Sequence, residues 1–318
     1  MKTDLHSLID DNPLILTECA ISERLRHHEG VQLHPTLFNT PLIYDSRGEA
    51  IMRDIYMQYR NIARKAHLPI LLCAPTWRLD QPRLQEAGFD DSLLEDAVTF
   101  MRRLQNDSQD PFSPCVLGGL IGPKNDCYSP EQALSIEAAE KYHSRQIEKL
   151  AMAGVECIVA QTIPALSEAM GMALALASSR IPYIISFVIN RSAEILDATP
   201  LHSGILHIDN HLTTPPLCYM VNCVYPTFLQ PEKQPRDMFD RLLGIQANSS
   251  SLDHSQLDGS TALHQDDLQH WGDTMLNLNK TYGIKILGGC CGTDNRYLQY
   301  LVDNVIDSPT AAARSAIS

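Results

Sequence analysis

Two adjacent cysteines near the C-terminus are the residues of this sequence whose type and spacing are best suited to chemistry. Cys290 and Cys291 follow a hydrophobic run and lie between glycines, in the segment ILGGCCGT at residues 286–293. Flanking glycines permit the sharp turn and close backbone approach that two neighbouring thiols need in order to bind one metal ion. Taken alone, the doublet is also compatible with a vicinal disulfide or with two buried free thiols.

A third cysteine, Cys223, ends another apolar run, CYMVNC at residues 218–223. Three thiolates that converge from two strand ends form a zinc site with one position open to a substrate. Thiolate ligands leave zinc electron-rich, so that it keeps a substrate sulfur nucleophilic and is a poor activator of water. None of the 12 histidines falls in a His-Glu-x-x-His spacing. This ligand set therefore indicates thiol alkylation and not hydrolysis.

At these residues the chain resembles the homocysteine S-methyltransferase family. The segment at residues 288–293 resembles the family's C-terminal signature, and VNC at residues 221–223 resembles its middle cysteine motif. The segment GVECIVAQTIP at residues 154–164 is similar to the family's strand ending in Glu-Thr-Ile-Pro, and the likeness extends from about Leu14 to Thr293. The resemblance implies that Zn²⁺ is bound by Cys223, Cys290 and Cys291. It also implies methyl transfer to the thiol of homocysteine, which gives methionine.

The chain departs from the family pattern at two positions that hold the amino-acid end of homocysteine in relatives. The family's N-terminal strand usually ends in Asp-Gly-Gly or Asp-Gly-Ala, but here Glu18 takes the place of the aspartate and Cys19 follows it. The glutamate before Thr-Ile-Pro is Gln161. We expect Glu18, Cys19 and Gln161 to contact substrate. The departures leave two alternatives open, a changed thiol acceptor or a zinc-binding barrel without transfer activity that serves as a binding or regulatory protein. A redox switch through Cys290 and Cys291 is a third alternative.

Apolar runs of strand length alternate with helical patterns along the chain, which is typical of a parallel sheet. The expected helices are 130–153, with Ser129 as N-cap, 166–178 and 268–282. Eight runs predict a closed (β/α)₈ TIM barrel, in one domain spanning residues 1–318 with a core at about 12–308: residues 14–17, 70–73, 116–120, 157–160, 183–188, 219–223, 243–246 and 285–288.

In such a barrel the catalytic residues lie at the carboxyl ends of the strands. The candidate residues each follow an expected strand: Glu18, Thr76, Gln161, Asn222, Cys223, Cys290 and Cys291. We expect Thr76 to face the substrate, and Asn222 either to bind it or to orient the loop of Cys223. Residues 246–265, rich in Ser, Asp and Gln, predict a long surface loop, and the tail after Pro309 is expected to fray.

Bulk properties exclude several classes of partner. The formal net charge of −13 argues against a nucleic-acid ligand. The longest apolar runs, such as residues 182–189, are too short to cross a membrane. Nine scattered cysteines and no secretory leader pattern are typical of a cytoplasmic protein. The expected partners are a small-molecule thiol acceptor and a small onium methyl donor, of the S-methylmethionine or betaine type, since the chain has no room for the cobalamin and folate domains of the large methionine synthases.

Overall fold

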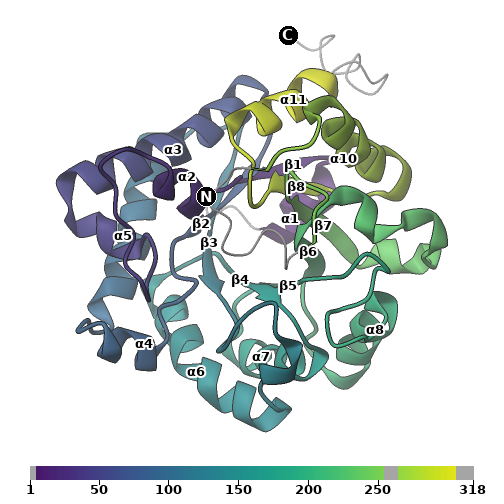
Figure 1. Cartoon of the computed structure of the whole chain (residues 1–318), viewed down its shortest axis with the longest axis horizontal. Coiled ribbons are helices and arrows are strands. Elements are labelled where there is room, and N and C mark those ends of the chain that lie inside the picture. The colour runs from purple at the N-terminus through teal and green to yellow at the C-terminus, as the bar shows by residue number, and fades with distance from the viewer. Residues whose placement is uncertain (1–4, 254–263, 306–318) are drawn as a thin grey trace.

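The computed structural model describes residues 5–253 and 264–305, and these residues form a closed barrel of parallel strands. Figure 1 looks down the barrel, with the strands at the centre and the helices around them. The sheet closes where β1 pairs with β8, in the register Ile15–Ile286 and Leu16–Leu287. This architecture confirms the predicted (β/α)₈ TIM barrel. The strands in order are β1 (Ile15–Thr17), β2 (Ile70–Ala74), β3 (Cys115–Ile121), β4 (Cys157–Ile163), β5 (Tyr183–Phe187), β6 (Cys218–Val224), β7 (Leu242–Ala247) and β8 (Ile286–Gly289).

The strands are apolar on both faces because the barrel is filled inside and covered outside. Alternate residues such as Leu71 and Cys73 of β2 belong to the packed interior, whereas Leu72 packs against the surrounding helices. The helix α1 (Leu5–Asp11) adds Leu5 and Ile9 to the interior cluster. Because α1 leads directly into β1, it closes the amino end of the barrel, and the opposite end is left for the site.

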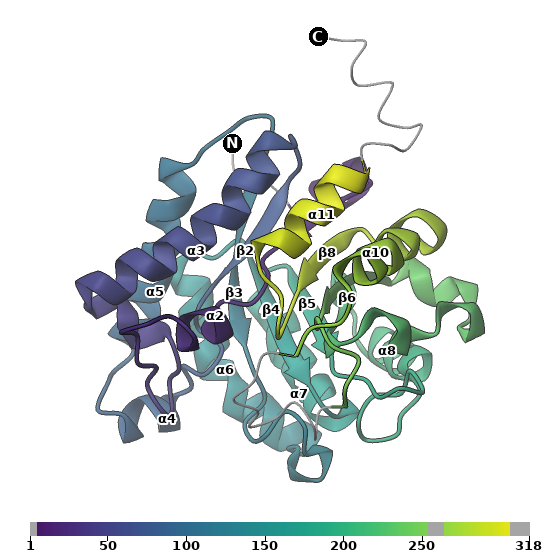
Figure 2. The ribbon, with the colours of Figure 1, turned by 45° about the horizontal axis from the view of Figure 1, so that its top comes forward.

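The outer helices follow the strands in the order expected for the fold. In Figure 2, α3 and α11 lie beside each other on the outer surface. Among the described residues, no helix is long and apolar enough to span a membrane. The main helices are α3 (Ser46–Lys65), α5 (Ser92–Asp107), α6 (Ile136–Ala153), α7 (Leu166–Ser179), α8 (Leu201–His211), α10 (Leu268–Tyr282) and α11 (Asn295–Val305). Two shorter helices are α2 (Ser22–Arg26), which precedes α3, and α4 (Gln81–Glu86), which precedes α5.

Two expectations about connecting segments are wrong. The helix expected from Pro130 begins at Ile136, where Ser135 is the N-cap and its hydroxyl accepts from the Ala138 N–H, and residues 130–132 form a separate 3₁₀ turn. The segment at residues 246–265 does not begin as a surface loop, since Asn248, Ser249 and Ser250 are buried. Residues 254–263 and the tail after Pro309 lie outside the described residues.

Candidate functional site

The structure brings the three predicted thiols together at the carboxyl ends of β6 and β8. The Sγ atoms of Cys223, Cys290 and Cys291 all lie within 4.8 Å of one another, and those of Cys223 and Cys290 are 2.7 Å apart. No other group of three or more His, Cys, Asp or Glu side chains in residues 5–253 and 264–305 is arranged in this way. All three side chains are free thiols in the structure.

Hydrogen bonds from the end of β7 fix the turn that carries the cysteine doublet. The Cys290 N–H donates to the Ala247 carbonyl over 2.8 Å, and the Cys291 N–H donates to Asn248 Oδ1 over 3.1 Å. The Thr293 hydroxyl donates back to the Cys290 carbonyl over 2.6 Å. Because both amides and both carbonyls of the doublet are already bonded, its two thiols can point to the same place without leaving buried backbone groups unpaired.

The glycines around the doublet are required for two different reasons. A Cβ atom on Gly289 would lie 2.1 Å from Thr293 Oγ1, so the close approach at this strand end excludes any larger residue. Gly292 has φ +78°, a conformation that costs other residues free energy, and its N–H donates to the Glu23 carboxylate. The expectation that the doublet needs flanking glycines agrees with this geometry.

Cys223 sits in a strained stretch of backbone that Asn222 supports. Cys223 has φ +53° and Thr162, at the end of β4, has φ +67°, and both strands pair irregularly at these points. Asn222 Oδ1 accepts from the Thr162 N–H over 2.9 Å and from the Ser186 hydroxyl over 2.7 Å. Its Nδ2 donates to Thr162 Oγ1 over 2.9 Å and to Cys223 Sγ over 3.3 Å. Asn222 is fully buried and does not line the cavity, so the structure favours the orienting role over a substrate contact.

The crowding of the thiols fits a bound cation. The hydrogen bond with Cys223 is the main cause that raises the pKa of Cys290 well above its usual value. Three such groups could become thiolates together only if a positive charge offset their mutual repulsion. Sulfur donors of this kind select soft or borderline metals such as zinc, so the donor set fits the predicted metal.

A cavity of about 380 Å³ opens onto the thiols. Among the predicted substrate contacts, Glu18, Cys19 and Gln161 line it together with all three cysteines. Its aromatic lining includes Phe38, Trp77 and Tyr128. The strand-end rule therefore located part of the cavity lining, and the segments after β1, β2 and β3 contribute many of its other residues.

Glu18 is almost completely buried at the end of β1. Burial raises the pKa of Glu18 to about 7, although its carboxylate accepts hydrogen bonds from the Thr17 hydroxyl over 3.2 Å and from the Cys73 N–H over 3.3 Å. The Glu18 carbonyl accepts from the Gly289 N–H, again over 3.2 Å. Glu18 is thus poised to change its charge near neutral pH and is tied to the strand that carries the cysteine doublet.

Gln161 pairs with a second neutral amide. Its Nε2 donates to Gln246 Oε1 over 2.6 Å, and Gln246 Nε2 in turn donates to the Glu18 carbonyl over 3.2 Å. The Gln161 carbonyl accepts from Trp77 Nε1 over 3.1 Å. The position therefore belongs to a hydrogen-bonded chain across the cavity floor in which neither amide carries a charge.

Thr76 does not reach the cavity, contrary to the expectation that it faces the substrate. Its hydroxyl donates to the Leu120 carbonyl over 2.8 Å and accepts from the Leu120 N–H over 2.9 Å, and the residue is fully buried. Thr76 instead joins the ends of β2 and β3. The sequence placed it correctly at a strand exit but carried no signal for the direction of its side chain.

Several cavity residues were missed by the sequence reasoning. Gln246 ends β7 and could have been found by the same strand-end rule, as could Arg78 just beyond β2. Tyr128 belongs to the loop after β3, where no motif marks it. Burial and then the nearby thiols, Cys223 first among them, raise the pKa of Tyr128 well above its usual value, so this phenol lies beside the cysteine cluster and stays neutral.

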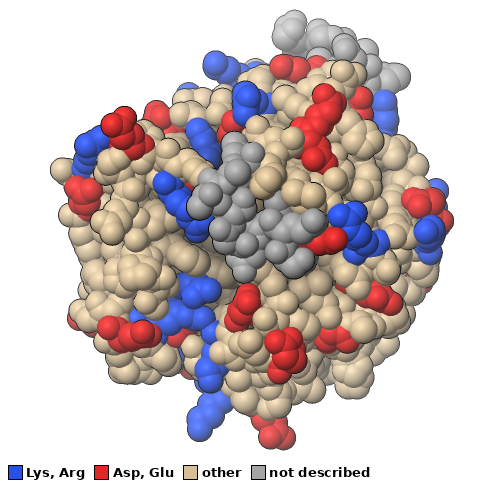
Figure 3. All heavy atoms as spheres, viewed as in Figure 1, with Lys and Arg blue, Asp and Glu red and all other residues tan. Residues whose placement is uncertain are grey.

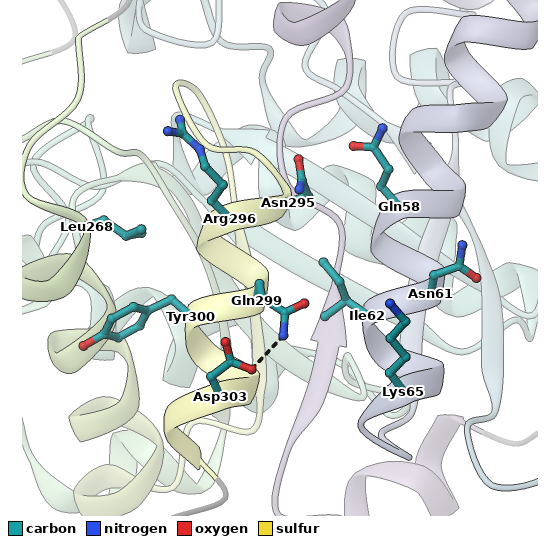
Figure 4. A pocket seen from close by; sticks show the side chains of 10 residues that line it. All are labelled: Gln58, Asn61, Ile62, Lys65, Leu268, Asn295, Arg296, Gln299, Tyr300 and Asp303. Atoms are coloured by element: carbon teal, nitrogen blue, oxygen red, sulfur yellow. Dashed lines mark hydrogen bonds between the residues drawn. The ribbon is translucent and has the colours of Figure 1, made fainter.

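A second hollow, of about 550 Å³, lies on the outside of the barrel. Figure 4 shows Gln58, Asn61 and Lys65 of α3 facing Gln299 and Asp303 of α11 across it. Its lining contains no cysteine and no histidine and shares no residue with the cavity at the strand ends. This groove therefore offers no donor set for the predicted chemistry.

Acidic and basic side chains are interspersed over the face that Figure 3 shows. A nucleic-acid site would need a continuous basic surface to neutralise phosphates. The described residues on the face in Figure 3 form no continuous basic surface of this kind.

Comparisons with known proteins agree with the site. The family model for homocysteine S-methyltransferase matches residues 15–305. A homocysteine S-methyltransferase from Escherichia coli (strain K12) is 21% identical, over 91% of this chain and 94% of its own length. The chain is also similar to two crystal structures of the homocysteine methyltransferase MmuM from Escherichia coli. The metallated form has a TM-score of 0.74 and 18% identity, with 94% of this chain and 99% of that chain covered. The oxidized form has a TM-score of 0.73 and 17% identity at the same coverage.

The structural likeness supports the barrel fold, and the match of the family model supports the activity class. That match spans all eight strands and includes the three clustered cysteines. The protein is therefore a methyltransferase that belongs to the homocysteine S-methyltransferase family.

Proposed function

We propose that this protein transfers a methyl group from a small onium donor, of the S-methylmethionine or betaine type, to the thiol of homocysteine, giving methionine. The observation that carries the proposal is the cluster of Cys223, Cys290 and Cys291 on the floor of a cavity large enough for small molecules. Family membership supports methyl transfer, and the names of the matched relatives support homocysteine as the acceptor.

We also propose that the three thiols bind one Zn²⁺ ion. One of the solved relatives is described in a metallated form, and the soft, crowded donor set of this chain suits zinc. When bound, zinc would supply the positive charge that keeps the acceptor sulfur in its nucleophilic thiolate form. The hydrogen bonds from Asn222 and to Asn248 hold the ligand loops in place for this task.

The remaining residues of the cavity would position the two substrates. The acceptor sulfur attacks the methyl carbon in line, and the donor's carbon–sulfur or carbon–nitrogen bond breaks, so that its onium centre leaves as a neutral thioether or tertiary amine. The neutral Tyr128 contributes an aromatic ring to the cavity lining, and aromatic rings attract onium groups.

Purified, reduced protein should convert homocysteine and trideuteromethyl-labelled S-methylmethionine or betaine into labelled methionine, detected by mass spectrometry. Cys290→Ala should abolish the reaction, whereas Cys115→Ala, which removes a buried thiol of β3 outside the cluster, should retain it. Absence of labelled product with both donors would overturn the proposed reaction. Labelled product from another thiol but not from homocysteine would establish the alternative of a changed acceptor.

A further inference from the structure

Arg78 is a cationic side chain of the cavity wall that has no hydrogen-bond or ion-pair partner among the residues that the structure describes. Its guanidinium forms no hydrogen bond or ion pair with residues 5–253 or 264–305, and its Nε is buried. Burial lowers the pKa of Arg78, although arginine stays charged at neutral pH. A half-buried charge without a counter-ion costs free energy, and a bound anion would remove that cost.

The aromatic rings of the cavity hold this guanidinium in place. Arg78 Cζ lies 4.6 Å from the centroid of the Phe38 ring and 5.1 Å from that of Trp77, and the two rings stack at 5.9 Å. Trp77 is fixed by its bond to the Gln161 carbonyl and by Gly122, where a Cβ atom would lie 2.4 Å from Trp77 Nε1. Contact with rings leaves the in-plane N–H groups of an arginine available, in the fork that matches a carboxylate.

The nearby acidic side chains are already bonded to other groups. Asp80 accepts from the Arg83 side chain and, over 2.7 Å, from the Tyr142 hydroxyl. Asp126 accepts from the Tyr128 N–H over 3.0 Å and from the Ser129 hydroxyl over 3.2 Å. These carboxylates interact with Arg78 only at longer range. The free donors of Arg78 therefore remain available to a ligand.

From this geometry we infer that Arg78 binds the carboxylate of the thiol acceptor, and that this carboxylate contributes more to acceptor binding than the ammonium does. The inference rests on the proposed function, since it concerns the acceptor of that reaction. On the ammonium side, Gln161 is neutral and is already paired with Gln246. The Glu18 carboxyl group is bonded to Thr17 and Cys73 and is largely buried. The preferred acceptors are therefore small thiols that carry a carboxylate, whether or not they carry an amine.

Thioether analogues separate the two charged groups without any need for methyl transfer. Isothermal titration calorimetry on the full chain would compare methionine, 4-(methylthio)butanoate, which lacks the ammonium, and 3-(methylthio)propylamine, which lacks the carboxylate. The first two should bind within about tenfold of each other, and the amine should bind about 10–100-fold more weakly, the range expected for one buried charge-assisted pair. Equal or tighter binding of the amine would overturn the inference.

Substitutions then assign the effect to Arg78. Arg78→Gln should remove the preference for the carboxylate-bearing analogues, and Arg78→Lys should restore part of it. Arg103→Gln, an exposed arginine of α5, should leave it unchanged. Arg78→Lys also provides a test if Arg78→Gln does not fold. An undiminished preference in a folded Arg78→Gln or Arg78→Lys variant would contradict the inference.

Steady-state kinetics distinguish the acceptor carboxylate from a carboxylate on the donor. Arg78→Gln should raise the KM of homocysteine about tenfold or more and leave the KM of the donor unchanged within about twofold. An increase confined to the donor KM would overturn the inference and assign Arg78 to the donor. If the wild-type protein binds the carboxylate analogues but transfers no methyl group, the proposed function fails while the anion subsite stands.

Discussion

Asn222 is the residue on which the geometry of Cys223 depends. It pairs with Thr162 and Ser186 and donates to the Cys223 sulfur, so it stabilises two non-glycine residues that have positive φ. Residues in this conformation cost about 1–3 kcal/mol each and persist only where the surroundings enforce them. The strain therefore lies at the point where the chain must aim a thiol into the cavity.

Replacing Asn222 by aspartate should weaken metal binding without removing the acceptor oxygen. Asn222→Asp loses the N–H bonds to Thr162 Oγ1 and Cys223 Sγ and puts a second acceptor against both. Supporting bonds of this kind are typically worth about 10–100-fold in metal affinity. Competition with a chromophoric zinc chelator measures the change, with the exposed Asn61→Asp as control. Equal affinity in both variants would contradict the supporting role of Asn222.

Glu18 should make the stability of the protein depend on pH. Its folded pKa of about 7 lies above the value of 4.5 for a free side chain, so its stability contribution is complete below about pH 4.5 and is lost as pH rises through 7. Glu18→Gln removes this loss. The free energy of unfolding of the variant, relative to that of wild type, should therefore increase by up to about 3 kcal/mol as the pH rises from about 5 to about 8. Urea unfolding at the two pH values measures the difference. A gain that does not vary with pH would mean that Glu18 titrates normally.

At the scale of the elements, the loop after β3 is fastened to the barrel by Glu168 of α7. The fully buried carboxylate accepts from the Lys124 N–H over 2.8 Å, from the Leu134 N–H over 3.2 Å and from His143 Nε2 over 3.0 Å. Although burial alone would raise it, these bonds lower the pKa of Glu168, with that from His143 first. The loop so held carries Tyr128 into the cavity wall.

Removal of the Glu168 carboxylate should strongly reduce the free energy of unfolding. Glu168→Ala leaves two backbone amides and the buried imidazole of His143 without their acceptor and should reduce the free energy of unfolding by about 3–5 kcal/mol. The exposed Glu137→Ala on α6 should change it by less than about 0.5 kcal/mol. Urea unfolding near neutral pH compares the two. Because the pKa of Glu168 is lowered from its usual value of 4.5, its contribution is present above about pH 4.5 and should be lost as pH falls further. A small effect of Glu168→Ala would show that the loop is held by other contacts.

The hydrogen bond between the Leu134 N–H and Glu168 explains why α6 begins later than its sequence pattern predicts. Proline and serine at residues 129–130 are a sound local start signal, but the Leu134 N–H bonds to Glu168, which is distant in sequence, and Ala133 is extended. A local pattern cannot report such a bond. The strands were easier to predict, because a run that is buried on both faces must be apolar throughout. Packing between elements, and not local sequence, also determines where the Thr76 side chain points and why the N–H groups of Arg78 have no acceptor among the described residues.

At the scale of the whole molecule, the site depends on strands from distant parts of the chain. Cys223 of β6 and the cysteine doublet just after β8 meet across the end of β7, and Glu18, just after β1, is bonded to Gly289 beside the doublet. The sequence could predict this meeting because a closed parallel barrel places all carboxyl ends on one face. It could not predict the Gln161–Gln246 pair, which depends on how two side chains cross the interior.

Metal removal should lower the thermal stability of the whole barrel. A metal ion that is present at a free concentration of about 100 times its Kd for the folded state adds about 2.7 kcal/mol to the free energy of unfolding. Any binding of the ion to the thiols of the unfolded chain reduces this gain. A strong chelator should therefore lower the Tm of the reduced wild-type protein by several degrees, and differential scanning calorimetry measures the shift. The Cys290→Ala variant should show no such shift. An identical response in the two proteins would place the metal elsewhere or exclude it.

The pairing of β1 with β8, which closes the barrel, also determines when the site can form during synthesis and folding of the chain. A ribosome releases Cys223 well before Cys290, and the turn at residues 290–293 has no scaffold until β8 has inserted between β7 and β1. Loop-closure entropy makes such an end-to-end pairing slow to form. A nascent or C-terminally truncated chain would thus contain Cys223 without the other two cysteines of the cluster, and its sheet would have two open edges. Maturation of the site is a late step in biogenesis, after the ends of the barrel have joined.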